Sequence, residues 1–362
     1  MAKTTSTAKT TTTDPTPTDP TTARTMTAVV QQAYGLDALK VGQRPVPAAG
    51  PGQLRIKVTA STVNPMDWHL GVGSPAIVRL AEGFGRPKHE IPGREACGVV
   101  EQLGVGVTDF KIGDLVFGWV TGAFAEYAIA EADRIWHAPV KMTEFECAAL
   151  PVAGAAALEA IERGDVMGKR VVVNGASGGV GHYAVQLAKS SGAQWVAGVC
   201  SSSNADFVRG LGADQVVAYD TEDFTSDRWD VIIDCIGNRS ASEIRGALVD
   251  DGRWVVIGDS KRDGLLGPLP RLVGRLIRWR FGSQSCHWFV QGEDAGYLEK
   301  LAALVENGLV RSHLSAAVTM DEVRAGYEKI ESGRTVGKLS VAIVAERGVE
   351  STESSNDVGN ES

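Results

Sequence analysis

The stretch that decides the fold is Val171-Val172-Val173-Asn174-Gly175-Ala176-Ser177-Gly178-Gly179-Val180-Gly181. Its β-branched residues predict a buried strand, its glycines predict a tight turn, and Ala-Val-Gln-Leu-Ala-Lys at 184–189 predicts a helix. In such a unit, backbone N–H groups and the positive end of the helix dipole face an incoming phosphate. We therefore predict that residues 174–181 bind a dinucleotide; the alternative is a tight turn that binds nothing.

Strand and helix patterns alternate after this unit. Apolar, strand-like runs occupy 195–199, 215–219, 229–234 and 253–258, and a helix is expected at 205–211. Alternation of this kind predicts an α/β fold with a parallel, doubly wound sheet. In such a sheet the ligand binds at the carboxyl ends of the strands.

Length and composition restrict the classes of protein that fit. The chain has 362 residues, which suggests about two domains, and 43% of the residues are hydrophobic. A net charge of −8 argues against a nucleic-acid partner. Since no apolar run approaches the ~20 residues of a membrane span, we expect no membrane partner.

The cysteines and the chain ends indicate where the protein resides. Five cysteines are widely scattered and form no CxxC pair, which favours a reducing cytoplasm over a disulfide framework. Residues 1–25, rich in Thr and Pro, and the acidic residues 347–362 are predicted to be disordered. Because the first segment lacks the apolar centre of a signal peptide, we expect a cytoplasmic protein, with Met26 a candidate for its true start.

The first third of the folded chain has a different pattern. Short strand-like runs punctuated by Gly and Pro fill residues 26–147, as in a small, largely antiparallel barrel-like domain. Two polar clusters, at 64–68 and 92–98, are expected at loop or strand ends.

Together these residues resemble the medium-chain dehydrogenase/reductase superfamily, in its zinc-independent, quinone oxidoreductase-like branch. The motifs that carry the resemblance are Asn64-Pro-Met-Asp67-Trp68, Pro92-Gly93-Arg94-Glu95-Ala96-Cys97-Gly98, Gly113-Asp114-Leu115-Val116-Phe117, Gly122-Ala123-Phe124-Ala125-Glu126-Tyr127, the glycine-rich stretch, Leu211-Gly212-Ala213-Asp214 and Gly337-Lys338. The resemblance implies a GroES-like catalytic domain (26–147 and 286–346), interrupted by a Rossmann domain (148–285). It also implies a homodimer.

A catalytic zinc ion is not expected. Where zinc-dependent relatives carry the first Cys ligand this chain carries Asn64, and where they carry Gly-His-Glu it carries Gly93-Arg94-Glu95. An open zinc site needs thiolate, imidazole or carboxylate ligands, and a guanidinium cannot supply one.

The end of the second predicted strand bears on the coenzyme. It reads Val199-Cys200-Ser201-Ser202-Ser203-Asn204 and contains no acid to accept from the ribose hydroxyls, so NADPH is favoured, with NADH as the alternative. Ser201, Ser202 and Ser203 can donate hydrogen bonds to a phosphate, although relatives place an Arg where this chain has Ser203. By the same resemblance, Tyr219 matches the position where family members place an aromatic residue near the adenosine phosphate; the alternative is a packing tyrosine. Gly258 and Lys338 complete the predicted coenzyme-binding set.

Without a metal ion, the acceptor of the hydride must already be electrophilic, as quinones and α,β-unsaturated carbonyl compounds are. The candidate catalytic residues are Asn64, Asp67, Trp68 and Arg94. Asn64 either donates to a carbonyl oxygen or stabilises the turn before Pro65. Arg94 either stabilises oxyanion charge or forms a structural bridge to Glu95 or Asp67. No obligatory acid stands out, so solvent is one source of the proton.

Three functions are compatible with this sequence. The first is an NADPH-dependent quinone or enone reductase. The second is a nucleotide-binding protein of the same fold with little turnover and a regulatory or structural role. The third, a residual alcohol dehydrogenase, is disfavoured by the missing zinc ligands.

Overall fold

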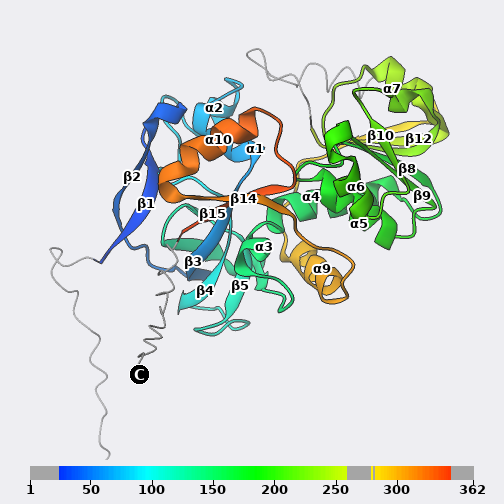
Figure 1. Cartoon of the computed structure of the whole chain (residues 1–362). Coiled ribbons are helices and arrows are strands. Elements are labelled where there is room, and N and C mark those ends of the chain that lie inside the picture. The colour runs from blue at the N-terminus through cyan, green and yellow to red at the C-terminus, as the bar shows by residue number, and fades with distance from the viewer. Residues whose placement is uncertain (1–23, 259–278, 280–281, 344–362) are drawn as a thin grey trace, which may run out of the picture.

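The computed structural model describes residues 24–258, 279 and 282–343. Most of both predicted tails, and most of the Leu/Arg-rich segment 264–280, lie outside the described residues. Figure 1 shows two lobes side by side, one built mainly from the green middle of the chain and the other from both its ends.

The green lobe is built on a parallel sheet. In the described part of the chain its six strands lie in the order β10-β9-β8-β11-β12-β13, and every neighbouring pair is parallel. Numbered along the chain this is the order 3-2-1-4-5-6 of a doubly wound dinucleotide-binding sheet, so the predicted α/β fold class is confirmed. The strands are β8 (Arg170–Asn174), β9 (Trp195–Cys200), β10 (Gln215–Ala218), β11 (Trp229–Asp234), β12 (Leu248–Val256) and β13 (Ser285–Trp288).

Alternation along these strands builds a core on each face of the sheet. Val171 and Val173 of β8 pack into a cluster with the helices on one face, whereas Val172 packs into a second cluster on the other face with Ile244 and Trp254. In the described part of the chain, this lobe has the helices α4 (Pro151–Gly164), α5 (Gly181–Ser190), α6 (Ala205–Gly210), α7 (Ala241–Ala247) and α9 (Ala295–Glu306). The strand β13 spans the predicted domain boundary between residues 285 and 286, and the domain division itself remains a prediction.

The other lobe is rich in antiparallel strands. Its main sheet, within the described residues, has the order β14-β15-β3-β4-β5-β7, with β6 also paired to β3. The strands are β3 (Gln53–Val63), β4 (Glu95–Leu103), β5 (Leu115–Trp119), β6 (Tyr127–Glu131), β7 (Ile135–His137), β14 (Leu314–Thr319) and β15 (Lys338–Ala342), and β1 (Thr25–Gln31) pairs separately with β2 (Leu39–Pro45). The helices are α1 (Pro65–Val72), α2 (Val78–Glu82), α3 (Glu144–Ala148) and α10 (Val323–Glu331).

The end of the folded chain joins the two lobes. After the parallel sheet, the chain returns to the β-rich lobe, where β15 pairs antiparallel with β3. Just before β15, the N–H of Gly337 donates to the carbonyl oxygen of Ser177 in the glycine turn, over 2.8 Å. The glycine turn and the β-rich lobe therefore meet directly before β15. No helix within the described ranges has the length and apolar character that crossing a bilayer requires.

Candidate active site

The glycine turn links β8 to α5, as predicted. Gly175 has a φ of 87°, which L side chains rarely adopt, and a Cβ on Gly181 would lie 2.0 Å from the carbonyl oxygen of Gly175. Both positions therefore require glycine. The helix begins at Gly181, and its N-cap residue Val180 makes no side-chain hydrogen bond. The N–H groups of His182 and Tyr183 already donate to the carbonyl oxygens of Gly178 and Val180. The N–H groups of residues 179–181, which have no acceptor within the described residues, stay available to an anion.

The strand ends beside this turn are tied together by a buried polar cluster. Asn174, the last residue of β8, donates from its amide to Asp234 Oδ1 over 2.9 Å and to Asn238 Oδ1 over 3.0 Å. Asp234 ends the neighbouring strand β11 and is fully buried. A Cβ on Gly258 would lie 2.0 Å from the carbonyl oxygen of Cys235, so only glycine fits where the chain leaves β12. These contacts fix the shape of the carboxyl edge.

His182 supports the turn from within the first turn of α5. Its Nδ1 lies 3.0 Å from the carbonyl oxygen of Gly178, and its Nε2 accepts from the backbone N–H of His313 over 3.3 Å. Burial lowers the pKa of His182 to about 3, so the ring is neutral and its Nδ1 carries the hydrogen.

The predicted adenosine end of the site lies after β9 and β10. The hydroxyls of Ser201 and Ser203 are hydrogen-bonded to each other over 2.8 Å, and Ser202 is bonded to the carboxylate of Asp220. Tyr219 directly follows β10, and 61% of its surface is exposed, which does not fit a packing tyrosine.

Lys338 is the centre of a buried network at the junction of the lobes. Its Nζ lies 2.8 Å from Glu95 Oε1 and 2.5 Å from Asn64 Oδ1, and the Asn64 amide donates to Glu95 Oε1 over 2.7 Å. The other Glu95 oxygen accepts from the backbone N–H of Val152, in the first turn of α4, over 2.7 Å. The stem of Lys338 reaches the glycine turn, where a Cβ on Gly179 would lie 3.4 Å from Lys338 Cδ.

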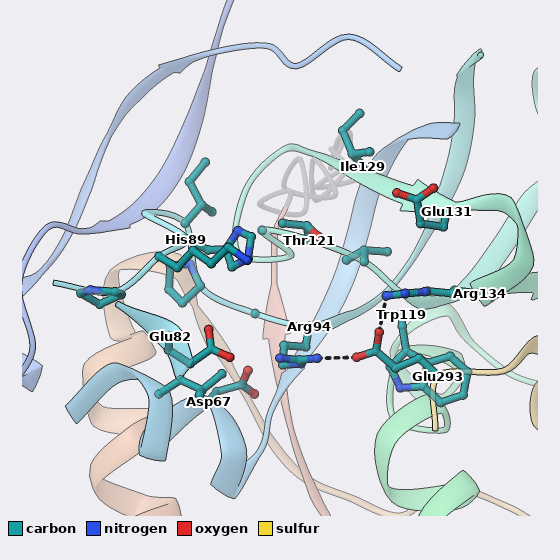
Figure 2. Close-up of a pocket in the computed structure, with 18 of the residues that line it drawn as sticks. Asp67, Glu82, His89, Arg94, Trp119, Thr121, Ile129, Glu131, Arg134 and Glu293 are labelled. Carbon is teal, nitrogen blue, oxygen red and sulfur yellow. Dashed lines mark hydrogen bonds and ion pairs between the residues drawn. The ribbon is translucent and has the colours of Figure 1, made fainter. Parts of the chain in front are cut away.

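A cavity of about 570 Å³ opens in the β-rich lobe, and Asp67 and Arg94 line it together with Trp119 and Glu293 (Figure 2). Glu293 accepts from Arg94 and, over 2.6 Å, from Arg134. The structural bridge predicted for Arg94 therefore exists, but its partner is Glu293, which sequence reasoning missed, instead of Glu95 or Asp67.

The four candidate catalytic residues thus fall in three places. Asp67 and Arg94 face the cavity, whereas Asn64 is buried in the Lys338 network and Trp68 packs in the apolar cluster of the β-rich lobe. Among the described residues that line the cavity, none belongs to the glycine turn at 174–181.

Asp67 is buried, and only one of its two carboxyl oxygens accepts a hydrogen bond within the described residues. Its Oδ2 accepts from the backbone N–H of Asn64 over 2.8 Å, and its Oδ1 has no hydrogen-bond partner within the described part of the chain. Burial raises the pKa of Asp67 to about 6; the hydrogen bond from Asn64 opposes this rise and the neighbouring Glu95 adds to it. The Tyr327 hydroxyl is likewise buried with no hydrogen-bond partner in that part of the chain, and its pKa is raised by burial and by Asp67. Asp67 can therefore exchange a proton near neutral pH.

Known proteins resemble this chain over most of its length. Residues 50–140 match the family model described as an alcohol dehydrogenase GroES-like domain, and residues 211–341 match the model described as a zinc-binding dehydrogenase. The chloroplast envelope quinone oxidoreductase homolog of Arabidopsis thaliana is 29% identical over 87% of this chain and 98% of that protein. The structure of the quinone oxidoreductase from Coxiella burnetii, at 28% identity, covers 89% of this chain and all of that one, with a TM-score of 0.78.

The chain belongs to the medium-chain dehydrogenase/reductase superfamily. Within it, the protein is a quinone oxidoreductase-like member and an oxidoreductase, as the sequence motifs predicted. The quinone-oxidoreductase homolog of Spinacia oleracea is 39% identical, over 56% of this oxidoreductase and 64% of that protein.

The prediction of a cytoplasmic location is wrong by this comparison. The relatives from Spinacia oleracea and Triphysaria versicolor are named chloroplastic, and the NAD(P)H oxidoreductase RTN4IP1 of Mus musculus, 28% identical over 81% of this chain, is named mitochondrial. Scattered free cysteines indicate only a reducing environment, so they could not distinguish the cytoplasm from an organelle.

Proposed function

We propose that this protein transfers a hydride from a reduced nicotinamide dinucleotide to a quinone or an α,β-unsaturated carbonyl compound without a metal ion. The observation that carries the proposal is the uncapped glycine turn at the carboxyl edge of the parallel sheet, which meets the β-rich lobe at Lys338. Among its relatives, the 2-methylene-furan-3-one reductase of Solanum lycopersicum is 29% identical over 85% of this chain.

The residues at the carboxyl edge suit such a coenzyme. The glycine turn has the open backbone that a pyrophosphate needs, and Ser201, Ser202, Ser203 and Tyr219 lie where the adenosine is expected. When bound, the coenzyme supplies the hydride. The protein's own residues hold the coenzyme, orient the acceptor and exclude water.

The form of the coenzyme depends on the loop after β9. The sequence favours NADPH, because no acid directly follows that strand. The structure brings the carboxylate of Asp220, which follows β10, onto the same loop, where it opposes a 2′-phosphate.

The Lys338 network supports a mechanism without zinc. The ammonium of Lys338 lies between Asn64 and Glu95, two of the positions that correspond to zinc-ligand motifs in other members of the superfamily. No group of three or more His, Cys, Asp or Glu side chains that could hold a metal ion occurs within the described ranges. We propose that the acceptor must be electron-poor by itself, and elemental analysis of the purified protein tests whether zinc is bound.

The charges around the cavity narrow the class of acceptor. Besides Asp67, the proposed proton donor, four carboxylates and three Lys or Arg side chains, with His89, line it in the described part of the chain. A negative balance of this kind disfavours an anionic acceptor. We propose an uncharged quinone or enone, whose developing enolate or quinol oxygen receives its proton from Asp67.

A spectrophotometric assay tests the proposed function. NADH and NADPH are each offered with a panel of uncharged quinones and alkenals, and with carboxylated quinones for comparison. Oxidation of a coenzyme that depends on an uncharged acceptor supports the proposal. Coenzyme binding without turnover across the panel would contradict it.

That second outcome corresponds to a nucleotide-binding protein with little turnover. One observation favours it: Asn64 and Arg94, the two candidate groups for stabilising a developing oxyanion, already have partners in the protein.

We further propose a homodimer, as the resemblance implies, and light scattering of the purified protein measures its mass.

A further inference from the structure

The short 3-10 helix at Ser202–Asn204 lies where a doubly wound sheet reads the adenosine ribose. It directly follows β9, the neighbour of the strand that leads into the glycine turn. The amide of Asn204 also lies 3.4 Å from the Ser177 hydroxyl in that turn. The group at the ribose 2′ position decides between the two coenzymes, since a 2′-hydroxyl suits an acceptor and a 2′-phosphate needs donors or a cation.

The donors of Ser202 are already used by an anion. The backbone N–H of Ser202 donates to Asp220 Oδ1 over 3.1 Å, and the Ser202 hydroxyl donates to Asp220 Oδ2. The hydroxyls of Ser201 and Ser203 bond to each other. A 2′-phosphate would need the same donors, so it would have to displace the carboxylate or lie against it.

The charge of Asp220 is present at neutral pH. The hydrogen bond from Ser202 lowers the pKa of Asp220. The charge also acts on the end of β9, where burial and then Asp220 raise the pKa of Cys200 to about 11. Arg209, which pairs with Asp206 over 2.5 Å, has the opposite effect and lowers the pKa of Cys200.

We infer that Asp220 is a specificity-determining residue that makes this protein favour NADH over NADPH, by holding Ser202 and repelling a 2′-phosphate. Its free carboxylate lone pairs can accept from a ribose 2′-hydroxyl, as the acid at the end of the second strand does in other NAD-binding folds. The acid differs from that pattern in coming from the third strand of the sheet. The inference rests on the proposed function only in taking a nicotinamide dinucleotide as the ligand.

The test is calorimetric binding of coenzyme fragments to the full chain. The probes are 5′-AMP and 2′,5′-ADP, which differ by the 2′-phosphate alone, followed by NADH and NADPH. We expect the wild-type protein to bind 5′-AMP more tightly than 2′,5′-ADP. In Asp220→Asn the affinity ratio should shift by about tenfold towards 2′,5′-ADP, the scale of repulsion between like charges near a protein surface.

A matched control separates this effect from the general loss of a negative charge. Glu222→Gln removes an exposed carboxylate two residues after Asp220 in the chain and should leave the ratio unchanged. Tighter binding of 2′,5′-ADP by the wild type, or an unchanged ratio in Asp220→Asn, overturns the inference. An equal shift in the Glu222→Gln control overturns it too. Because Asp220 is exposed, Asp220→Asn is expected to fold, and its thermal midpoint checks this.

The inference about Asp220 and the proposed function can be contradicted separately by these experiments. A fragment ratio that shifts as expected, in a protein that reduces no acceptor, leaves the inference standing and contradicts the proposed function. Turnover with a marked preference for NADPH supports the proposed function and contradicts the inference about Asp220.

Discussion

At the scale of the residue, Asp67 has the environment that most changes its chemistry. The carboxyl group is 2% exposed and lines the cavity, and one of its oxygens has no hydrogen-bond partner among the described residues. Burial penalises its charged form, so its pKa rises from 3.8 to about 6. A group whose pKa is raised on folding stabilises the protein below its unfolded pKa, and that contribution is lost as the pH rises through the folded pKa.

Asp67→Asn should therefore change the pH dependence of stability. The unfolding free energy of the variant minus that of the wild type should rise by up to about 3 kcal/mol between about pH 4 and pH 7, because the variant has no carboxyl group to ionise. Urea denaturation across this range measures it. Asp133→Asn, at the exposed rim of the same cavity, is the control and should give a flat difference. A flat difference for Asp67→Asn would contradict the assigned environment.

The same substitution tests the proton transfer. If Asp67 protonates the product, Asp67→Asn should lower kcat by about 100-fold or more with little change in the coenzyme's Kd. Steady-state kinetics with a quinone, together with coenzyme titrations, separate the two quantities. An unchanged kcat would point to solvent as the proton source.

At the scale of the element, the glycine turn differs from an ordinary loop because its backbone leaves no room for a side chain at Gly181. A Cβ at Gly181 would meet the carbonyl oxygen of Gly175, a backbone atom that cannot move without opening the turn. By contrast, a Cβ at Gly210, in the last turn of α6, would meet nothing within 4 Å.

Gly181→Ala should weaken coenzyme binding by at least about tenfold and destabilise the protein by about 1–3 kcal/mol, because the turn must shift to accept the methyl group. Gly210→Ala should leave binding unchanged and stabilise the protein by up to about 1 kcal/mol. Calorimetry and thermal unfolding measure both quantities. Normal coenzyme binding by Gly181→Ala would show that the turn does not hold the pyrophosphate.

The element scale also shows what the sequence could and could not predict. The strand, turn and helix around Gly175 are contiguous, so local pattern was enough to predict them. Asp220 and Ser202 lie 18 residues apart, after different strands, and Arg94 and Glu293 lie 199 residues apart. Nothing local indicates such partners, because the sheet order and the return of the chain bring them together. For the same reason, Tyr327 gave no sequence signal as a neighbour of Asp67.

At the scale of the whole molecule, the buried pair of Lys338 and Glu95 lies in the β-rich lobe at the junction of the lobes, where Glu95 also accepts from the backbone N–H of Val152 in α4. Lys338 Nζ and Glu95 Oε1 lie 2.8 Å apart, and both side chains are almost fully buried. Removing one partner of a buried ion pair leaves the other charge desolvated and unpaired. The pair therefore matters most when it is broken.

Lys338→Met should destabilise the protein by about 3–5 kcal/mol, and the double variant Lys338→Met/Glu95→Gln should recover much of that loss. Urea denaturation of the wild type, both single variants and the double variant gives the coupling energy. Additive losses would show that the two charges do not depend on each other. Coenzyme affinity measured on the double variant, with the charge imbalance removed, reports whether Lys338 itself contacts the ligand.

The position of β15 has a consequence for biosynthesis. This strand lies between β14 and β3, inside the sheet that the first third of the chain begins. During translation, residues 60–63 of β3 have no strand neighbour on that edge until residues 339–342 leave the ribosome, because β6 pairs only with residues 53–57. Unpaired edges of this kind invite association with other chains. A ribosome stalled shortly before residue 338 should therefore display a nascent chain that recruits chaperones, which release it only when the final strand emerges.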